Sequence, residues 1–167
     1  MIIFEDELAK LVGIIPIAVV NETELQINFG WGTESVLAKY LTLKGKLSFP
    51  LIWLVEGEDE NNLFEPSVKR SNARIVILYE SQAPEQFNDY QHEWDYKVVL
   101  QPILDNLLIA LENSYISMYE PTSFRTQRVK NYSMRSENES LVYVCNAIVL
   151  NADITFFGKK CLNNFIQ

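Results

Sequence analysis

Three strand-length segments of this chain carry apolar side chains on both of their faces. They are Phe49–Val55, Ile75–Leu78 and Leu141–Leu150. A strand that faces water on one side alternates apolar and polar residues, because successive side chains point to opposite faces of the sheet. Both faces therefore need cover, which comes either from helices of this chain or from a second copy of it.

Helical spacing of the apolar residues predicts three helices. They are Phe4–Val12, Thr33–Tyr40 and a long helix from about Glu93 to Ser114. Gly13 is expected to end the first helix, and the Thr33 hydroxyl is expected to cap the second. Pro102 falls inside the long helix, where a proline costs about 3 kcal/mol. The long helix therefore either kinks at Pro102 or begins near Gln101.

Two weaker strands are predicted near the N-terminus and one long strand near the C-terminus. Ile14–Val20 is apolar and β-branched, but Pro16 restricts it to a sheet edge or an extended lead-in. Leu25–Phe29 alternates apolar and polar residues and is expected to stop at Gly30-Trp31-Gly32. The last strand, Leu141–Phe157, is expected to place its even-numbered apolar residues on one face and its odd-numbered ones on the other.

These elements predict an α+β fold in which a mostly antiparallel sheet carries one long helix packed across one face. The 167 residues have the length of a single domain with a real hydrophobic core, and residues 1–167 are predicted to form one domain. The polar segment at about residues 115–140 is expected to form an extended arm or a hairpin.

Composition excludes several classes of function. The 14 Lys and Arg residues against 22 Asp and Glu residues give a net charge of −8, which repels nucleic-acid phosphates. One His and two Cys cannot supply the four ligands of an all-Cys/His zinc site, and Cys145 and Cys161 are expected to be reduced thiols. No apolar run reaches the roughly 18–20 residues of a membrane-spanning helix. Glu5, Asp6 and Glu7 stand where a secretory signal would be basic. We expect no cofactor, no metal and no membrane partner.

Two groups of polar residues are the candidates for chemistry. One is an acidic cluster that follows a strong strand: Glu56, Glu58, Asp59 and Glu60. Its spacing matches no calcium loop and favours a solvated acidic turn. The other is His92, which Asp95 could orient as a general base, although no nucleophile in a strand-turn-helix setting accompanies it. We accordingly predict no catalytic residue.

Basic residues gather around the extended polar segments. They are Lys69, Arg70, Arg74, Arg125, Arg128, Lys130 and Arg135. They could contact DNA or the acidic surface of a neighbouring subunit. The net charge of −8 favours contacts between subunits, because an acidic chain repels DNA.

The order and size of these elements resemble the tail terminator and neck (head-to-tail connector) proteins of long-tailed bacteriophages. The resemblance rests on the N-terminal helix, the helix Tyr96–Leu111 and three strands: Phe49–Val55, Asn72–Tyr79 and Leu141–Leu150. Segment 115–140 has no counterpart in that family. The resemblance implies a non-catalytic virion subunit, assembled in the host cytoplasm. Such subunits form a homo-oligomeric ring, usually of six, that contacts neighbouring tail or neck proteins and lets DNA pass without binding it.

The resemblance also implies where the interface residues lie. Phe49 and Trp53 would sit in the core or in the ring interface. The acidic loop Glu56–Glu60 and the arm that carries Arg125 and Arg128 would meet neighbours. Two alternatives stay open: a small ligand-binding or hydrolytic enzyme domain that uses His92 and the acidic loop, and an adaptor that binds another protein through its apolar face.

Overall fold

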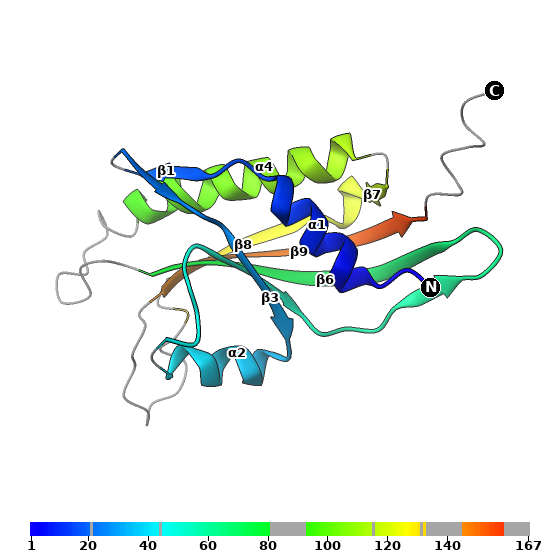
Figure 1. The fold of residues 1–167 in the computed structure, drawn as a ribbon, viewed down its shortest axis with the longest axis horizontal. Helices are drawn as coiled ribbons and strands as arrows, with labels where there is room; N and C mark the ends of the chain where they lie inside the picture. Colours follow the sequence, from blue (N-terminus) through cyan, green and yellow to red (C-terminus); the bar gives the residue numbers. More distant parts are fainter. Residues whose placement is uncertain are drawn as a thin grey trace.

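The computed structural model describes residues 1–20, 22–43, 45–80, 93–114, 116–130, 132 and 145–158. This part contains a seven-stranded sheet with helices on both faces and a separate two-stranded ribbon (Figure 1). The elements in chain order are α1 Phe4–Ile14, β1 Ala18–Val20, β2 Thr23–Leu25, β3 Asn28–Gly32, α2 Glu34–Leu41, β4 Leu51–Val55, β5 Glu60–Asn62, β6 Ser67–Glu80, η2 Asp95–Leu100, α4 Gln101–Asn113, β7 Ser117–Tyr119, η3 Pro121–Ser123, β8 Arg125–Val129 and β9 Cys145–Phe157.

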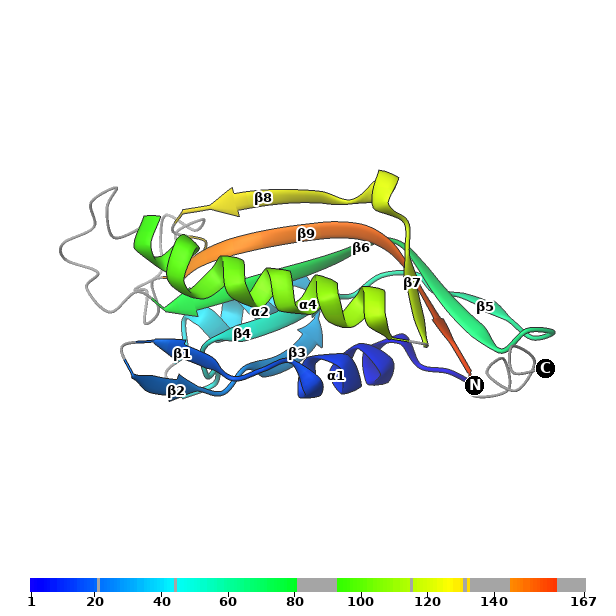
Figure 2. The same ribbon diagram turned by 90° about the horizontal axis from the view of Figure 1, so that it is seen from above.

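The sheet has the order β3-β4-β6-β9-β7, with β5 added to β6 and β8 added to β9. Only the β3–β4 pair is parallel among the described pairs, so the predicted α+β class with a mostly antiparallel sheet is confirmed. The expectation of one long helix across one face was incomplete. Helices α1 and α4 share one face, as Figure 2 shows from above, and α2 packs on the other.

The apolar strands are buried on both faces, as their sequences predict. Toward α1 and α4 they direct Ile52, Leu54, Ile75, Ile77, Ile148 and Leu150. Toward α2 they direct Leu51, Trp53, Val76, Leu78, Ala147 and Val149. Leu37 and Leu41 of α2 are almost fully buried against this second face. This chain therefore supplies cover for both faces of its own sheet. Burying each such leucine contributes about 1.5–3 kcal/mol to stability.

The long helix forms in two successive geometries. Segment η2 is a π-helix, and the Gln101 N–H donates to the carbonyl of Tyr96, five residues earlier. Helix α4 then begins at Gln101 with Pro102 in its first turn, where the missing N–H of proline is tolerated. The wide π turn therefore accommodates the proline without ending the helical path.

Strand β6 is longer than predicted, because a β-bulge lies between Arg70 and Ala73. Before the bulge Val68 faces the α1 side of the sheet, and after it Ala73 does. The extra residue shifts the alternation by one, and Asn72 takes a positive φ of 52° there. The Asp153 carboxylate accepts a hydrogen bond from the Asn72 N–H at 2.6 Å and fixes the bulge. The part of β6 before the bulge forms a hairpin with β5 that projects past the helices (Figure 1).

Gly30 and Gly32 of β3 lie directly against the indole ring of Trp53. Gly30-Trp31-Gly32 lies inside the strand, so the prediction that it ends one was wrong. A Cβ on Gly30 would lie 2.8 Å from Cε3 and Cζ3 of Trp53, and the Trp53 indole N–H donates to the Gly32 carbonyl at 3.3 Å. The glycines leave room for the ring against the β3 backbone.

The N-terminal boundaries also differ from the prediction. Helix α1 runs through Gly13 and ends before Pro16, because a residue that precedes proline is pushed out of the helical region. Ile15 is accordingly extended, with ψ at 133°. The predicted strand Ile14–Val20 is reduced to β1, which pairs with β2.

The described part of the predicted arm at 115–140 consists of two strands of the sheet, β7 and β8, with the short helix η3 between them. Strands β7 and β8 both pair with β9 in antiparallel register. The alternation predicted for Leu141–Phe157 is confirmed over β9, with Ile148 on the α4 side and Ala147 on the α2 side, and residues 141–144 lie outside the described ranges. None of the helices in the described residues is long and apolar enough to cross a membrane.

Candidate assembly surface

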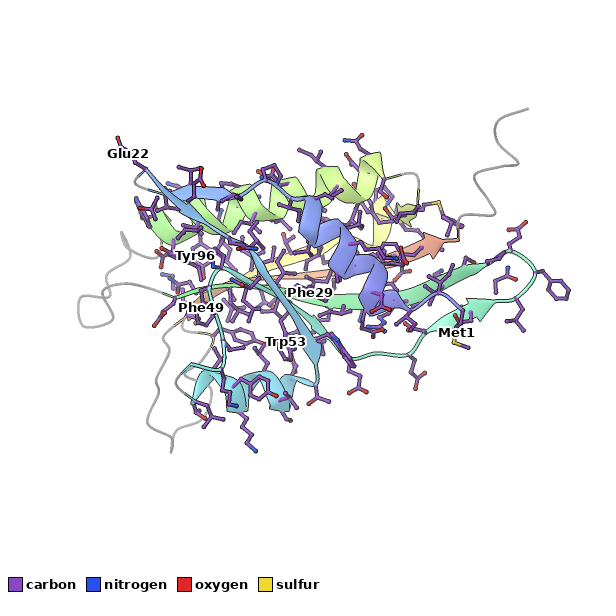
Figure 3. The ribbon with its side chains drawn as sticks, in the orientation of Figure 1. Met1, Glu22, Phe29, Phe49, Trp53 and Tyr96 are labelled. Carbon is purple, nitrogen blue, oxygen red and sulfur yellow. The ribbon has the colours of Figure 1, made fainter. Side chains whose placement is uncertain are left out.

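Phe49 and Trp53 lie on the side of the sheet that α2 covers (Figure 3). Trp53 is 3% exposed, and its ring meets the Tyr40 ring edge-on with 6.2 Å between centroids. Phe49 is half-buried and packs against the same apolar cluster. Trp53 therefore belongs to the core, the first of the two places predicted for it, and leaves no surface for a neighbour.

The acidic loop is partly neutralised by Arg70, which is buried and so cannot contact DNA or a neighbouring subunit as the sequence predicted. Arg70 is 2% exposed, donates to both carboxylate oxygens of Asp59 at 2.6 and 3.0 Å, and donates to Glu5 of α1 at 2.6 Å. Its guanidinium also stacks over the Phe4 ring at 4.4 Å. Burial alone would lower the pKa of Arg70, but the hydrogen bonds to Asp59 and Glu5 outweigh it and raise that pKa. Arg70 of β6 thus ties Asp59, at the base of the β5–β6 hairpin, to Glu5 of α1.

The other acidic residues of the loop point to solvent. Glu56, Glu58 and Glu60 are exposed, and Glu60 opens β5. The Glu56 N–H extends the sheet by donating to the Gly32 carbonyl at 2.9 Å. Three exposed carboxylates and one arginine-bound carboxylate form a solvated acidic rim at the root of the hairpin.

Basic residues on β6 are held by carboxylates of the same chain. Arg74 donates to Glu34 at the start of α2 at 2.7 Å. Lys69 lies 3.7 Å from Glu120, which follows β7. Exposed pairs of this kind are worth about 0–1 kcal/mol, yet they reduce the positive charge that these residues could offer to DNA.

Arg125 and Arg128 lie on β8 at an edge of the sheet. The Arg128 guanidinium sits 5.2 Å from the centroid of the Tyr96 ring. Charged side chains along an edge strand oppose the addition of a further strand from another chain. This edge is therefore protected against pairing with a strand of another chain. Arg135, the last of the predicted basic residues, lies outside the described residues.

Asp95, which the sequence offered as a partner for His92, has a buried structural contact at the start of η2. Asp95 is buried and accepts a hydrogen bond from the Asn146 amide at 2.6 Å. Burial, and after it the charges of Glu80 and Asp95, raise the pKa of the Cys145 thiol, and a protonated buried thiol is a poor nucleophile. His92 lies outside the described residues, as does Cys161. Within the described ranges, no three His, Cys, Asp or Glu side chains are placed to hold a metal ion.

The turn of the β5–β6 hairpin exposes two large apolar side chains. Leu63 is 87% exposed and Phe64 is 100% exposed. The turn is held by Asn62, whose side-chain oxygen accepts hydrogen bonds from the N–H groups of Phe64 at 3.0 Å and Glu65 at 3.3 Å. An Asx turn of this kind orders the backbone locally. We call Leu63 and Phe64 the apolar tip.

A second apolar surface lies where the C-terminal parts of α1 and α4 meet. A groove of about 630 Å³ is bordered there, mainly by apolar residues: Leu11, Ile14, Ile15, Pro16, Ile109, Ala110 and Ile116. Ile14 is 70% exposed and Ile109 is 52% exposed. Its polar border consists of Lys10, Asn106, Asn113 and Ser114 and contains no carboxylate. We call this surface the α1–α4 groove.

No protein-family model matches this sequence, and no curated protein matches it.

The apolar tip was missed in the sequence, although a signal for it exists. Leu63 and Phe64 are adjacent large apolar residues in the otherwise polar run Glu56–Ser67. An apolar pair in a charged loop cannot be explained by strand or helix burial, so it predicts two exposed apolar side chains. The α1–α4 groove has no comparable signal, because it forms only when two helices distant in sequence pack together.

Proposed function

We propose that this protein is a non-catalytic structural subunit that assembles with copies of itself into a ring at the neck or tail end of a long-tailed bacteriophage particle. One observation carries the proposal. Large apolar side chains are exposed at two separate places, the apolar tip and the α1–α4 groove, although the chain covers both faces of its own sheet. Exposed apolar surface that the core does not need is typical of contacts between proteins.

Two different apolar surfaces on one chain favour a head-to-tail arrangement. A contact between unlike patches leaves one of each patch available on the outermost copies, so assembly continues until a ring closes or a filament grows. Phage neck and terminator subunits form closed rings, which is the geometry that such contacts produce when the rotation between copies closes.

The charge of the chain fits a ring through which DNA passes. The net charge is −8, and the exposed Glu56 and Glu58 carry part of it. An acidic lumen repels the duplex and so does not hold it. Other neck or tail proteins would be the further partners, and the assembled ring would reside in the virion.

Size-exclusion chromatography with light scattering, over a concentration series, tests the proposal. We expect a species whose mass is an integer multiple of 19.3 kDa, and ring-shaped particles in negative-stain images of that species. A mass of 19.3 kDa at every concentration up to the solubility limit would contradict the proposal. Retention of duplex DNA by the assembled species at low salt would contradict the idea of a non-binding lumen.

A further inference from the structure

We infer that the apolar tip of one subunit inserts into the α1–α4 groove of the next subunit. This inference rests on the proposed ring and names the contact that builds it. The occupant of the groove is thus a second copy of this chain, and the contact is heterologous, with the tip on one side and the groove on the other.

The tip is ordered before it meets a partner. Asn62 holds the turn through two hydrogen bonds to backbone N–H groups, and the Gly158 N–H donates to the Pro66 carbonyl at 2.7 Å. At the hairpin base, Arg70 bridges Asp59 and Glu5. A preordered side chain loses less conformational entropy on docking, which makes full exposure of Phe64 useful to a contact.

Charge complementarity favours this occupant. The groove is bordered by Lys10, whose side chain is 65% exposed and lies 2.5 Å from the Glu7 carboxylate, and the residues that line the groove include no carboxylate. A pair at the surface is worth only about 0–1 kcal/mol, so Lys10 can exchange Glu7 for a carboxylate of a partner. The tip is flanked by the exposed carboxylates of Glu60 and Glu65. On a chain with net charge −8, an acid-free apolar groove beside a lysine is matched by an apolar tip between two acids.

The position of the tip keeps it from filling the groove of its own chain. The hairpin projects at one end of the sheet, whereas the groove lies where α1 and α4 meet beside the body of the sheet (Figures 1 and 2). A groove of about 630 Å³ is within the roughly 300–1,000 Å³ range of sites that enclose a compact apolar ligand. It therefore has room for the two side chains of a tip.

The insertion would anchor a larger contact. One phenylalanine buries about 150–250 Å², far less than the roughly 1,600 Å² of a standard interface. Interfaces concentrate their binding energy in a few central aromatic side chains and surround them with weaker contacts. Phe64 and Ile109 are therefore the positions at which a single substitution should have the greatest effect on assembly.

Three exposed apolar positions allow a matched test. Phe64→Asp disables the tip, and Ile109→Asp disables the groove. Met118→Asp is the control, because Met118 on β7 is 51% exposed, against 52% for Ile109, and belongs to neither surface. We expect Phe64→Asp and Ile109→Asp to run as monomers of 19.3 kDa and Met118→Asp to form the wild-type species. Circular dichroism and urea unfolding establish that all three variants are folded.

Mixing the two disabled variants gives the decisive result. The intact tip of Ile109→Asp can enter the intact groove of Phe64→Asp, and the complex then carries one disabled tip and one disabled groove. We expect a mixture at high concentration to form dimers and nothing larger. A photoreactive benzoylphenylalanine at position 64 of the wild-type chain should crosslink to the groove residues of a neighbour, which fall within 10–16 and 106–116.

The outcomes separate this inference from the proposed function. If the wild-type chain is monomeric, the ring itself is refuted and this contact is refuted with it. If the wild-type chain forms rings and both disabled variants do too, the ring stands and the tip-in-groove contact is wrong. The contact is also wrong if the mixture stays monomeric or if position 64 crosslinks outside the groove.

Discussion

Replacing Gly30 by alanine should destabilise the protein, because the space beside its backbone belongs to Trp53. The added Cβ would lie 2.8 Å from two carbons of the indole ring, whereas carbon atoms attract each other best at about 3.5–4.0 Å. Trp53 of β4 is buried against β3 and α2, so its ring can move only by disturbing other core side chains. The clash therefore persists as strain.

The magnitude follows from two opposing effects. Forcing extra volume into a packed core costs about 1–3 kcal/mol. An alanine in place of a strand glycine recovers roughly 0.5–1 kcal/mol, because the unfolded chain loses less freedom. Gly30→Ala should therefore lower the free energy of unfolding by up to about 2.5 kcal/mol, with a central value of about 1 kcal/mol. For a chain of this size each kcal/mol lowers Tm by about 2–4 °C.

The sign of this effect should reverse once the indole is removed. In a Trp53→Leu background, Gly30→Ala loses the clash and keeps the backbone gain, so it should be neutral or stabilising by up to about 1 kcal/mol. The coupling energy of the double-mutant cycle should be about 1–3 kcal/mol. No such reversal is expected if Gly30 is required for its own backbone conformation.

Urea unfolding followed by far-ultraviolet circular dichroism measures all four members of the cycle, since tryptophan fluorescence changes when Trp53 is replaced. Gly13→Ala is the matched control. A Cβ on Gly13 meets nothing within 4 Å, and a glycine-to-alanine change in a helix gains up to about 1 kcal/mol. An equal loss of stability from Gly30→Ala with and without Trp53 would refute the steric reasoning.

Three further substitutions test other contacts of the fold by urea unfolding. Arg70→Met should cost about 2–4 kcal/mol, because it strips the buried cation from the carboxylates of Glu5 and Asp59, and a smaller loss would mean that water already solvates them. Thr33→Ala should cost about 1 kcal/mol, because the Thr33 hydroxyl accepts the Val36 N–H at 3.2 Å. Burial raises the pKa of Tyr96 to about 12, so as the pH rises the unfolded chain loses the Tyr96 proton before the folded chain does. The free energy of unfolding should therefore fall between about pH 10 and 12. Tyr96→Phe should make that fall less steep, and an unchanged slope would contradict the assignment.

The strands with two apolar faces were predictable, because burial on both sides leaves a continuous apolar run in the sequence. Strand β4 and the described part of β9 lie where those runs predict. The start of β6 was not predictable in this way. Its bulge at Ser71 and Asn72 shifts the alternation by one residue, so the strand seems to end where it only changes register. Burial patterns report which residues need cover and not which partner supplies it.

The candidate site was harder to predict, because its parts depend on contacts between distant segments. Arg70 reads as a surface arginine until Glu5, 65 residues away, and Asp59 are brought to it. Trp53 reads equally well as core or interface until α2 is seen to cover it. The sequence predicts the acidic loop as a solvated turn, and Glu56, Glu58, Asp59 and Glu60 are all exposed, but it gives no sign that Arg70 binds Asp59.

The exposure of Phe64 on the β5–β6 hairpin is useful to a contact only because the rest of the hairpin is held in place. A fully exposed phenylalanine gives an assembling subunit useful binding energy only if the turn that carries it is fixed, because ordering a flexible loop on contact costs about 1–2 kcal/mol per residue. The bulge directs the hairpin away from the core. The ion pairs of Arg70 with Asp59 and Glu5 hold its base against α1, and the Asn62 side chain closes its turn. Burying the Arg70 ion pairs and holding Asn72 at a positive φ both have a free-energy cost, although the hairpin adds little to the core. This cost is explained if the hairpin makes a contact outside its own chain.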